Sequence, residues 1–195
     1  MEERAPSRPA SSAMSATGEF GDLFETGRHG AGGEGTGRHG GRPSTRTHPV
    51  HQPVYERFNT PVIVFVTVCT KDRKRILANE VAHEILLAAW QEARSWLVGR
   101  YVIMPDHVHL FCAPAEIHPK PLLQWISYWK SYAARTWPRP GDAPVWQRHF
   151  WDTQLRRGIN YAEKWEYFLQ NPVRAGLVAR AEDWPFAGTI QELRW

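Results

Sequence analysis

Apolar residues first gather at positions 62 to 70, where the sequence reads VIVFVTVCT. The run is nearly all apolar and rich in β-branched residues, which is typical of a buried central strand. No apolar run precedes it, and it is far shorter than the roughly 20 residues that a membrane-spanning helix requires. The pattern predicts a strand over Val62–Thr70 in a soluble protein without a secretory signal.

The next apolar positions recur with helical spacing. Asn79 is suited to cap a helix and Gly99 is suited to stop one. Between them, the apolar residues near one helix face are Val81, Ile85, Leu86, Ala89, Trp90 and Trp96. The pattern predicts a helix from Asn79 to about Val98.

Two further strands are expected to pair as a hairpin. Pro105 and Asp106 interrupt a strand-like stretch and divide it into Arg100–Met104 and His107–Ala113. The elements predicted beyond this hairpin are a helix over Leu122–Trp137 ended by the turn PRPG at 138–141, a strand over Val145–Phe150 and a helix over Asn160–Asn171.

The order strand, helix, two strands, helix, strand predicts the fold class. It is the order of an α+β, ferredoxin-like split βαβ sheet with antiparallel pairing. The helices are expected to cover one face of the sheet and to leave the other face open. A polar cluster on the open face would then be accessible to a substrate.

Composition divides the chain into two parts. Residues 1–50 contain 10 of the 15 glycines and none of the 10 tryptophans, and TGRHG occurs twice within them. Such a segment lacks the apolar groups that offset the entropy of ordering a chain. We expect a disordered Gly/Arg-rich extension over 1–50 and one folded domain over 51–195.

The net charge of +4 belongs to the second part, because residues 1–50 hold six arginines and six acidic residues. Aromatic residues alternate with basic ones between Pro119 and Arg157, a mixture suited to phosphates and stacked bases. A helix with an aromatic core stripe and a solvated basic face explains the pattern equally well. The candidate DNA-binding residues are Lys130, Arg135, Arg148, Arg156 and Arg157.

The two cysteines, Cys69 and Cys112, both lie in apolar stretches with no metal-binding spacing. We expect buried, unpaired thiols, which fits a reducing cytoplasm.

The sequence HVH at 107–109 is a candidate metal site. Side chains alternate along a strand, so both histidines face one way, with Cα atoms about 7 Å apart, and both imidazoles can reach one ion. The same pattern is also common on an ordinary polar strand face, so further ligands are needed to decide.

Tyr167 stands apart from the core stripe of its predicted helix. At about 100° per residue, the apolar sector contains Tyr161, Trp165, Phe168 and Leu169, and Tyr167 lies outside it, one turn before Asn171. The phenol at 167 and the amide oxygen at 171 could address one site. A surface tyrosine at a helix edge is the alternative.

Several of these stretches together resemble a known family. PDHVHL at 105–110, FWDTQLR at 150–156, EYFLQNPVRAGLV at 166–178 and DWPF at 183–186 are similar to motifs of the single-tyrosine HUH (IS200-like) transposases, most closely the REP-associated tyrosine transposases. The likeness runs from about Val54 to Leu193. It implies a ferredoxin-like enzyme that cuts and rejoins single-stranded DNA beside hairpins, as a monomer or homodimer.

The resemblance also implies roles for individual residues. His107 and His109 match the metal-binding histidine pair, Asn171 matches the third ligand, and Tyr167 matches the nucleophile that forms a 5′-phosphotyrosine. Two imidazoles favour Mn²⁺, whereas phosphate oxygens and cellular abundance favour Mg²⁺, so either ion fits.

One position departs from the family pattern. Thr153 follows the Asp of the FWDT motif, where the family often has His. This departure leaves open a DNA-binding regulator on the same fold with weak or lost cleavage. A separate alternative is an unrelated metal-dependent hydrolase that uses HVH with a zinc-bound water.

Overall fold

The computed structural model describes residues 62–155 and 161–193, all of which lie in one compact unit of the chain. The expected boundary near residue 50, the extension before it and Asn160 lie outside these residues. Five strands form one sheet in the order β4-β1-β3-β2-β5, and every neighbouring pair is antiparallel. The strands are β1 (Val64–Cys69), β2 (Trp96–Met104), β3 (His107–Pro114), β4 (Trp151–Gln154) and β5 (Ala187–Thr189).

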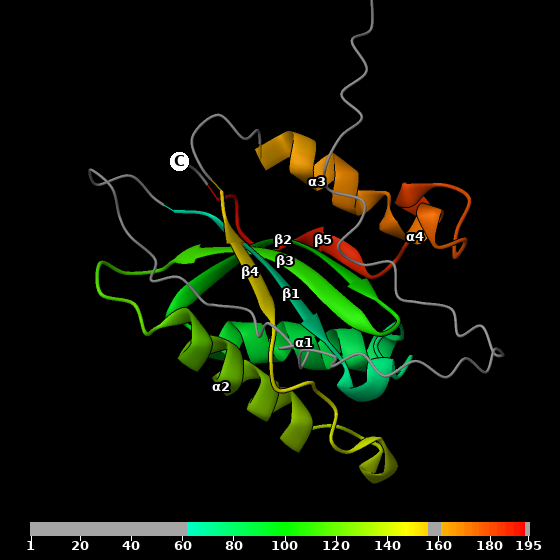
Figure 1. Ribbon diagram of the computed structural model, residues 1–195, viewed down its shortest axis with the longest axis horizontal. Coiled ribbons are helices and arrows are strands. Elements are labelled where there is room, and N and C mark those ends of the chain that lie inside the picture. Colours follow the sequence, from blue (N-terminus) through cyan, green and yellow to red (C-terminus); the bar gives the residue numbers. More distant parts are fainter. Residues whose placement is uncertain (1–61, 156–160, 194–195) are drawn as a thin grey trace, which may run out of the picture. The chain divides into compact units, whose positions relative to one another are not determined.

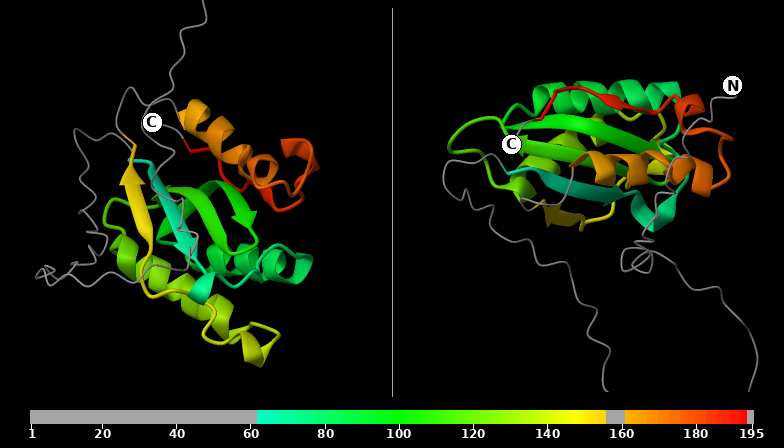
Figure 2. Two further views of the ribbon diagram at one scale, coloured as in Figure 1. Left: turned by 45° about the vertical axis from the view of Figure 1, so that its right-hand side comes forward. Right: turned by 90° about the horizontal axis from the view of Figure 1, so that it is seen from above.

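The sheet has the split βαβ arrangement that the order of elements predicts. β1 and β2 run in the same direction because both pair antiparallel with β3, which lies between them. The helices α1 (Glu80–Glu92) and α2 (Leu122–Arg135) lie side by side on one face of this sheet (Figures 1 and 2). The α+β ferredoxin-like sheet is therefore confirmed.

Alternate strand positions fill the space between the sheet and these two helices. The residues that β1 and β3 contribute to this cluster are Val64, Val66, Val68, Val108, Leu110 and Cys112, none of them exposed. Trp125 and Trp129 of α2 are also almost completely buried. The Asn79 side chain accepts a hydrogen bond from the backbone N–H of Ala82, which confirms the predicted N-terminal cap of α1.

The predicted end of the first helix is wrong. α1 ends at Glu92, and Trp96 begins β2 four residues before the expected strand start at Arg100. The Trp96 ring lies 6.0 Å from that of Trp125, and its Nε1 donates to the carbonyl of Lys120. An apolar residue at position 96 fits the apolar face of a helix and a buried strand equally well. Periodicity alone therefore could not locate the boundary between α1 and β2.

The predicted strand over Val145–Phe150 is also wrong. In that segment only Trp146 pairs, through an isolated bridge to Thr70, and β4 begins at Trp151. Val145, Trp146 and Phe150 are buried in the cluster beneath the helices. The apolar run therefore reflects core packing by an irregular segment, which resembles a strand in composition.

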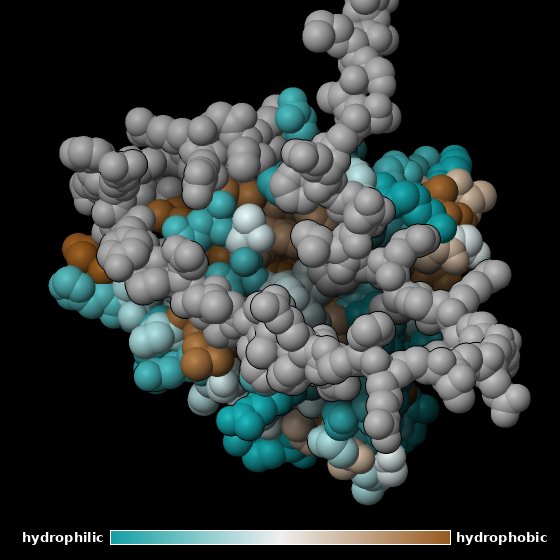
Figure 3. Space-filling model, in the orientation of Figure 1, coloured by the Kyte–Doolittle hydropathy of each residue, from teal (hydrophilic) through white to brown (hydrophobic). Residues whose placement is uncertain are grey.

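The second face of the sheet is not left open, contrary to the expectation. Three further short 3-10 turns and two short helices complete the fold: η1 (Lys71–Arg73), η2 (Pro140–Asp142), η3 (Ala181–Asp183), α3 (Tyr161–Leu169) and α4 (Asn171–Arg174). α3 packs on this second face, where a smaller apolar cluster contains Ile63, Phe65, Phe111 and Trp165. In the space-filling view, the residues visible at the bottom of the molecule are mostly hydrophilic, with a few hydrophobic ones among them (Figure 3).

Two smaller expectations concern cysteines and membranes. Cys69 and Cys112 are buried and free of disulfide bonds, as predicted. Within the described residues, no helix combines the length and the apolar character needed to cross a bilayer.

Candidate functional site

The two histidines of HVH lie together on the sheet face opposite α1 and α2. His107 and His109 alternate along β3 with Val108, which points into the core beneath the helices. The two Nε2 atoms are 3.1 Å apart, and the rings are nearly perpendicular. The alternation predicted from the sequence therefore brings both imidazoles to one point.

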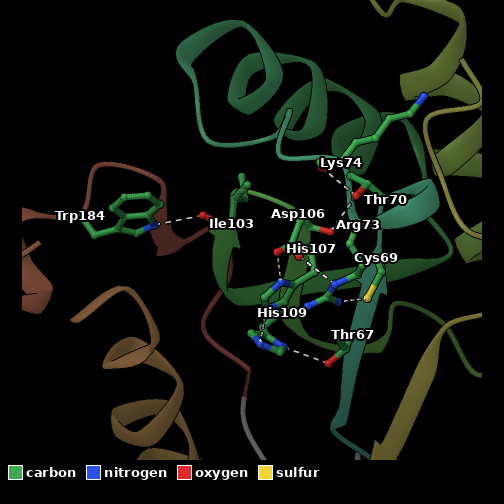
Figure 4. A network of polar contacts seen from close by, with 10 residues as sticks. All are labelled: Thr67, Cys69, Thr70, Arg73, Lys74, Ile103, Asp106, His107, His109 and Trp184. Atoms are coloured by element: carbon green, nitrogen blue, oxygen red, sulfur yellow. Dashed lines mark hydrogen bonds and ion pairs between the residues drawn. The ribbon is translucent and has the colours of Figure 1, made fainter. Parts of the chain in front are cut away.

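The outer nitrogen of each imidazole has its own partner (Figure 4). His107 Nδ1 lies 2.7 Å from Oδ1 of Asp106, and His109 Nδ1 lies 2.9 Å from Oγ1 of Thr67 on β1. Arg73 follows β1 and pairs with the other carboxylate oxygen of Asp106 at 2.8 Å. Such partners fix the orientation of each ring and leave the Nε2 atoms directed at each other.

Two members of this cluster, His109 and Asp106, have shifted pKa values. Burial lowers the pKa of His109 well below its ordinary value, and the positive charges of His107, Arg73 and Arg174 lower it further, so this imidazole is neutral. Burial acts to raise the pKa of Asp106, but the hydrogen bond and charge of His107 and the charge of Arg73 outweigh it. The pKa of Asp106 is therefore lowered, and its carboxylate accepts the Nδ1–H of His107.

The spacing of the two Nε2 atoms fits a divalent ion. Neighbouring ligands of an octahedral ion with bonds of about 2.1 Å are about 3 Å apart, close to the 3.1 Å between these nitrogens. Among residues 62–155 and 161–193, no group of three or more His, Cys, Asp or Glu side chains is placed to hold a metal. Asn171 is not one of these residue types, so its role as a third ligand stays a prediction.

The sequence predicts that Tyr167 and Asn171 share one continuous helix, and this prediction is wrong. α3 ends at Leu169, and Asn171 begins α4, so Pro172 falls in the first turn of a new helix. Tyr167 is 45% exposed, which agrees with its predicted place outside the apolar sector.

Arg174 connects these two residues, although sequence reasoning did not single it out. Its Nη2 donates to the carbonyl of Tyr167 at 2.7 Å and to Oδ1 of Asn171. Its guanidinium also lies 4.0 Å from the centre of the Tyr167 ring, in a cation–π contact. The signal available in the sequence was the spacing of three and seven residues, which places Arg174 one and two helical turns after its partners.

Phe168 brings the tyrosine-bearing helix to the histidines. Its ring stacks on that of Phe65 with centroids 4.0 Å apart and lies 4.9 Å from the ring of His109. Phe65 also stacks on His109. Tyr167, one residue earlier on α3, is thereby held beside the same sheet face as the histidine pair.

The three candidate DNA-binding residues that the structure describes are not gathered at this face. Arg156 and Arg157 lie outside the described residues, and Arg135 is exposed on α2, behind the sheet. Arg148 is exposed before β4. Lys130 is only 9% exposed, and its Nζ donates to the carbonyls of Gln147 and Arg148, so a phosphate contact would require it to leave them.

Thr153 lies on the histidine face of β4. It is the cross-strand partner of Phe65, and directly opposed residues of an antiparallel pair project to the same side. A family-type histidine at this position would therefore share a face with His107 and His109.

Comparison with known proteins agrees with this fold. Residues 61–156 match the family model described as transposase IS200-like, and this domain belongs to that family. More particularly, the chain is similar to REP-associated tyrosine transposases. It is 24% identical over 145 residues to one described in Haemophilus influenzae (strain ATCC 51907 / DSM 11121 / KW20 / Rd), covering 68% of this chain and 82% of the relative. It is 27% identical over 94 residues to one of Escherichia coli (strain K12), covering 48% of this chain and 54% of that relative.

A solved structure shows the same fold. It is a REP-associated tyrosine transposase bound to a REP hairpin, 23% identical in sequence, with a TM-score of 0.56 over 70% of this chain and 82% of the other.

Proposed function

We propose that the protein is a metal-dependent enzyme that nicks single-stranded DNA beside hairpin-associated repeats and transfers the cut strand. The observation that carries this proposal is the pair of Nε2 atoms 3.1 Å apart beside the helix that presents Tyr167. Membership of the transposase family supports it. So do relatives named after REP elements and a structural neighbour bound to a REP hairpin.

The metal-binding residues would be His107, His109 and Asn171. When bound, Mg²⁺ or Mn²⁺ would supply positive charge that orients the phosphodiester and offsets charge developing on it. Asp106 and Thr67 hold the two imidazoles in the ligating orientation through their Nδ1 atoms. Arg174 holds the Asn171 side chain and the Tyr167 backbone in one arrangement.

Tyr167 would be the nucleophile. Its phenol oxygen attacks the phosphorus, the bond from phosphorus to the 3′ oxygen breaks, and the 3′ oxygen leaves as a hydroxyl after taking a proton. The phenol proton passes to solvent, since the side chain is 45% exposed. A 3′-hydroxyl from a second DNA end then attacks the phosphotyrosine, re-forms a diester and releases the tyrosine.

The test is covalent adduct formation on a hairpin-bearing single-stranded oligonucleotide in Mg²⁺ or Mn²⁺. The wild type should give an adduct that survives denaturing electrophoresis, and Tyr167→Phe should give none, because the phenol oxygen is the linking atom. Tyr128→Phe is a matched control, since Tyr128 on α2 is also 45% exposed but lies behind the sheet. An adduct with Tyr167→Phe, or none with the wild type, would contradict the mechanism.

A DNA-binding regulator on the same fold is the second candidate. Thr153, on the histidine face where the family often has His, is the observation that favours it. Tight binding of the hairpin with no adduct in either metal would support this candidate over the nicking enzyme.

A further inference from the structure

The turn after β1 has an unusual backbone. Asp72 and Arg73 have φ values of 56° and 55°, in the left-handed region. Residues other than glycine enter this region at a cost, because Cβ approaches the following carbonyl oxygen. Aspartate enters this region more readily than most residues, but arginine does not, and two consecutive cases in one turn point to a functional constraint.

The surrounding chain holds this turn in place from several sides. The backbone N–H of Thr70 donates to the carbonyl of Asp106, and that of Lys71 donates to the carbonyl of Val145. Thr70 Oγ1 lies 2.8 Å from the carbonyl of Lys74, and Lys74 Nζ donates to that of Asp142. The strained conformation is thus fixed by a contact within the turn and by contacts from two other segments, at Asp106 and over residues 142–145.

The strained turn delivers the Arg73 side chain to the histidine face. Its Nε pairs with Asp106 at 2.8 Å, and its Nη1 donates to Sγ of Cys69, the cross-strand neighbour of His107. The guanidinium lies beside the two imidazoles (Figure 4), and its charge contributes to lowering the pKa of His109. The side chain is still 42% exposed, and these contacts use only two of its five N–H donors.

We propose that Arg73 forms a phosphate-binding subsite beside the histidine pair, occupied by a DNA phosphate adjacent to the one that is cleaved. A guanidinium held by Asp106 at Nε and by Cys69 at Nη1 has a fixed plane, and its remaining N–H donors lie in the planar geometry that phosphate oxygens prefer. The subsite rests on the proposed function, because it assumes a DNA strand crossing this face.

The experiment measures DNA binding without cleavage. Fluorescence anisotropy of a hairpin-bearing single-stranded oligonucleotide is recorded in EDTA, at salt concentrations from about 50 to 200 mM. Arg73→Gln should lower the affinity about fivefold near 0.1 M salt and reduce the slope of log K against log[salt] by about 0.7 to 1. Arg73→Lys should restore the slope, because it keeps the charge.

Two controls separate a phosphate contact from other roles. Arg75→Gln removes the same charge from an exposed residue of the same segment and should change the slope less. Asp106→Asn removes the partner of Arg73 and should not weaken binding in EDTA. If Arg73 only supported Asp106 and His107, Arg73→Gln would bind like the wild type under these conditions.

A melting experiment tests whether the turn is strained. Arg73→Gly should melt above Arg73→Ala, the reverse of the usual order, because both lose the guanidinium but only glycine tolerates a φ of 55°. If Arg73→Ala melted at a higher temperature than Arg73→Gly, the backbone at position 73 would not be strained.

The outcomes are distinct from those of the adduct assay. An unchanged salt slope for Arg73→Gln, an equal change for Arg75→Gln, or no DNA binding by the wild type overturns the subsite. If the wild type forms no Tyr167-dependent adduct but Arg73→Gln still reduces the salt slope of DNA binding, only the nicking mechanism is overturned.

Discussion

Lys130 on α2 is a buried lysine: the residue is only 9% exposed. Its Nζ donates to the carbonyls of Gln147 and Arg148, in the irregular segment that leads to β4. Burial lowers the pKa of Lys130 to about 8, because the charged form loses its hydration. A single side chain thus ties α2 to a segment that has little regular pairing of its own.

This lowered pKa gives stability a defined pH dependence. Between about 8 and the unperturbed value near 10.5, the unfolded chain binds more protons at this site than the folded protein does. The contribution of Lys130 to the free energy of unfolding should therefore rise with pH across that window. Urea unfolding of the wild type and Lys130→Met should show a smaller rise in the variant, and Lys71→Met, at an exposed lysine, should keep the wild-type slope. Identical slopes in all three proteins would contradict the assignment.

At the scale of elements, α3 is attached to the sheet mainly by aromatic stacking. Phe168 contacts the rings of Phe65, Phe111 and His109, while Tyr161 lies against Phe111. Arg100 of β2 adds cation–π contacts to Tyr161 and Trp165. The position of the tyrosine-bearing helix relative to the histidines therefore depends on a small number of rings.

Phe168→Ala should lower the free energy of unfolding by about 2 kcal/mol, because it removes a partly buried ring. It should reduce the rate of adduct formation by at least about tenfold, because α3 loses its contact with His109. Tyr132→Ala is the control, since Tyr132 is a partly buried aromatic packed on the other cluster. Equal losses of adduct rate in the two variants would show a general effect of stability.

At the scale of the whole described molecule, the C-terminal segment joins the two faces of the sheet. β5 pairs with β2, and Trp184 Nε1 donates to the carbonyl of Ile103. Near the end of this segment, Leu193 lies over Gly99, so a Cβ at Gly99 would be 2.7 Å from the leucine side chain and 3.1 Å from the Tyr161 hydroxyl. Gly99 is thus the point where β2, α3 and the C-terminal segment meet.

Gly99→Ala should therefore destabilise the protein by about 1 to 3 kcal/mol through overpacking. Leu193→Ala should cost less in the Gly99→Ala background than in the wild type, because the added methyl group occupies part of the vacated space. Thermal or denaturant unfolding of the four proteins of this cycle measures the coupling. Additive effects would show that the two residues do not touch.

The sequence predicts those features that depend on the period of a regular element. Alternation along β3 places His107 and His109 together, and helical angles place Tyr167 outside the apolar sector. The order of elements predicts the split βαβ sheet. The metal, the nucleophile and the phosphate contacts remain predictions of function.

Features that depend on tertiary contacts could not be predicted in the same way. An apolar residue such as Trp96 or Trp146 can be buried in a helix, in a strand or in an irregular core segment. The apolar pattern therefore did not reveal which of these structures each residue adopts. Arg73 reaches the histidine face from a turn with a left-handed backbone, which no sequence period indicates. Arg174 contacts Tyr167 and Asn171 at the break between α3 and α4. The sequence instead predicts one helix that stops after Asn171.

The short outer strands have a consequence for solubility. The described sheet is bounded by β4 and β5, of four and three residues, whereas β1 between them reads VFVTVC and is buried throughout. A long, uncharged strand of this kind pairs readily with other chains when its edge is exposed. β4 covers one edge of β1 along most of its length, so a substitution that detaches β4 would expose an edge at which other chains can pair and aggregate.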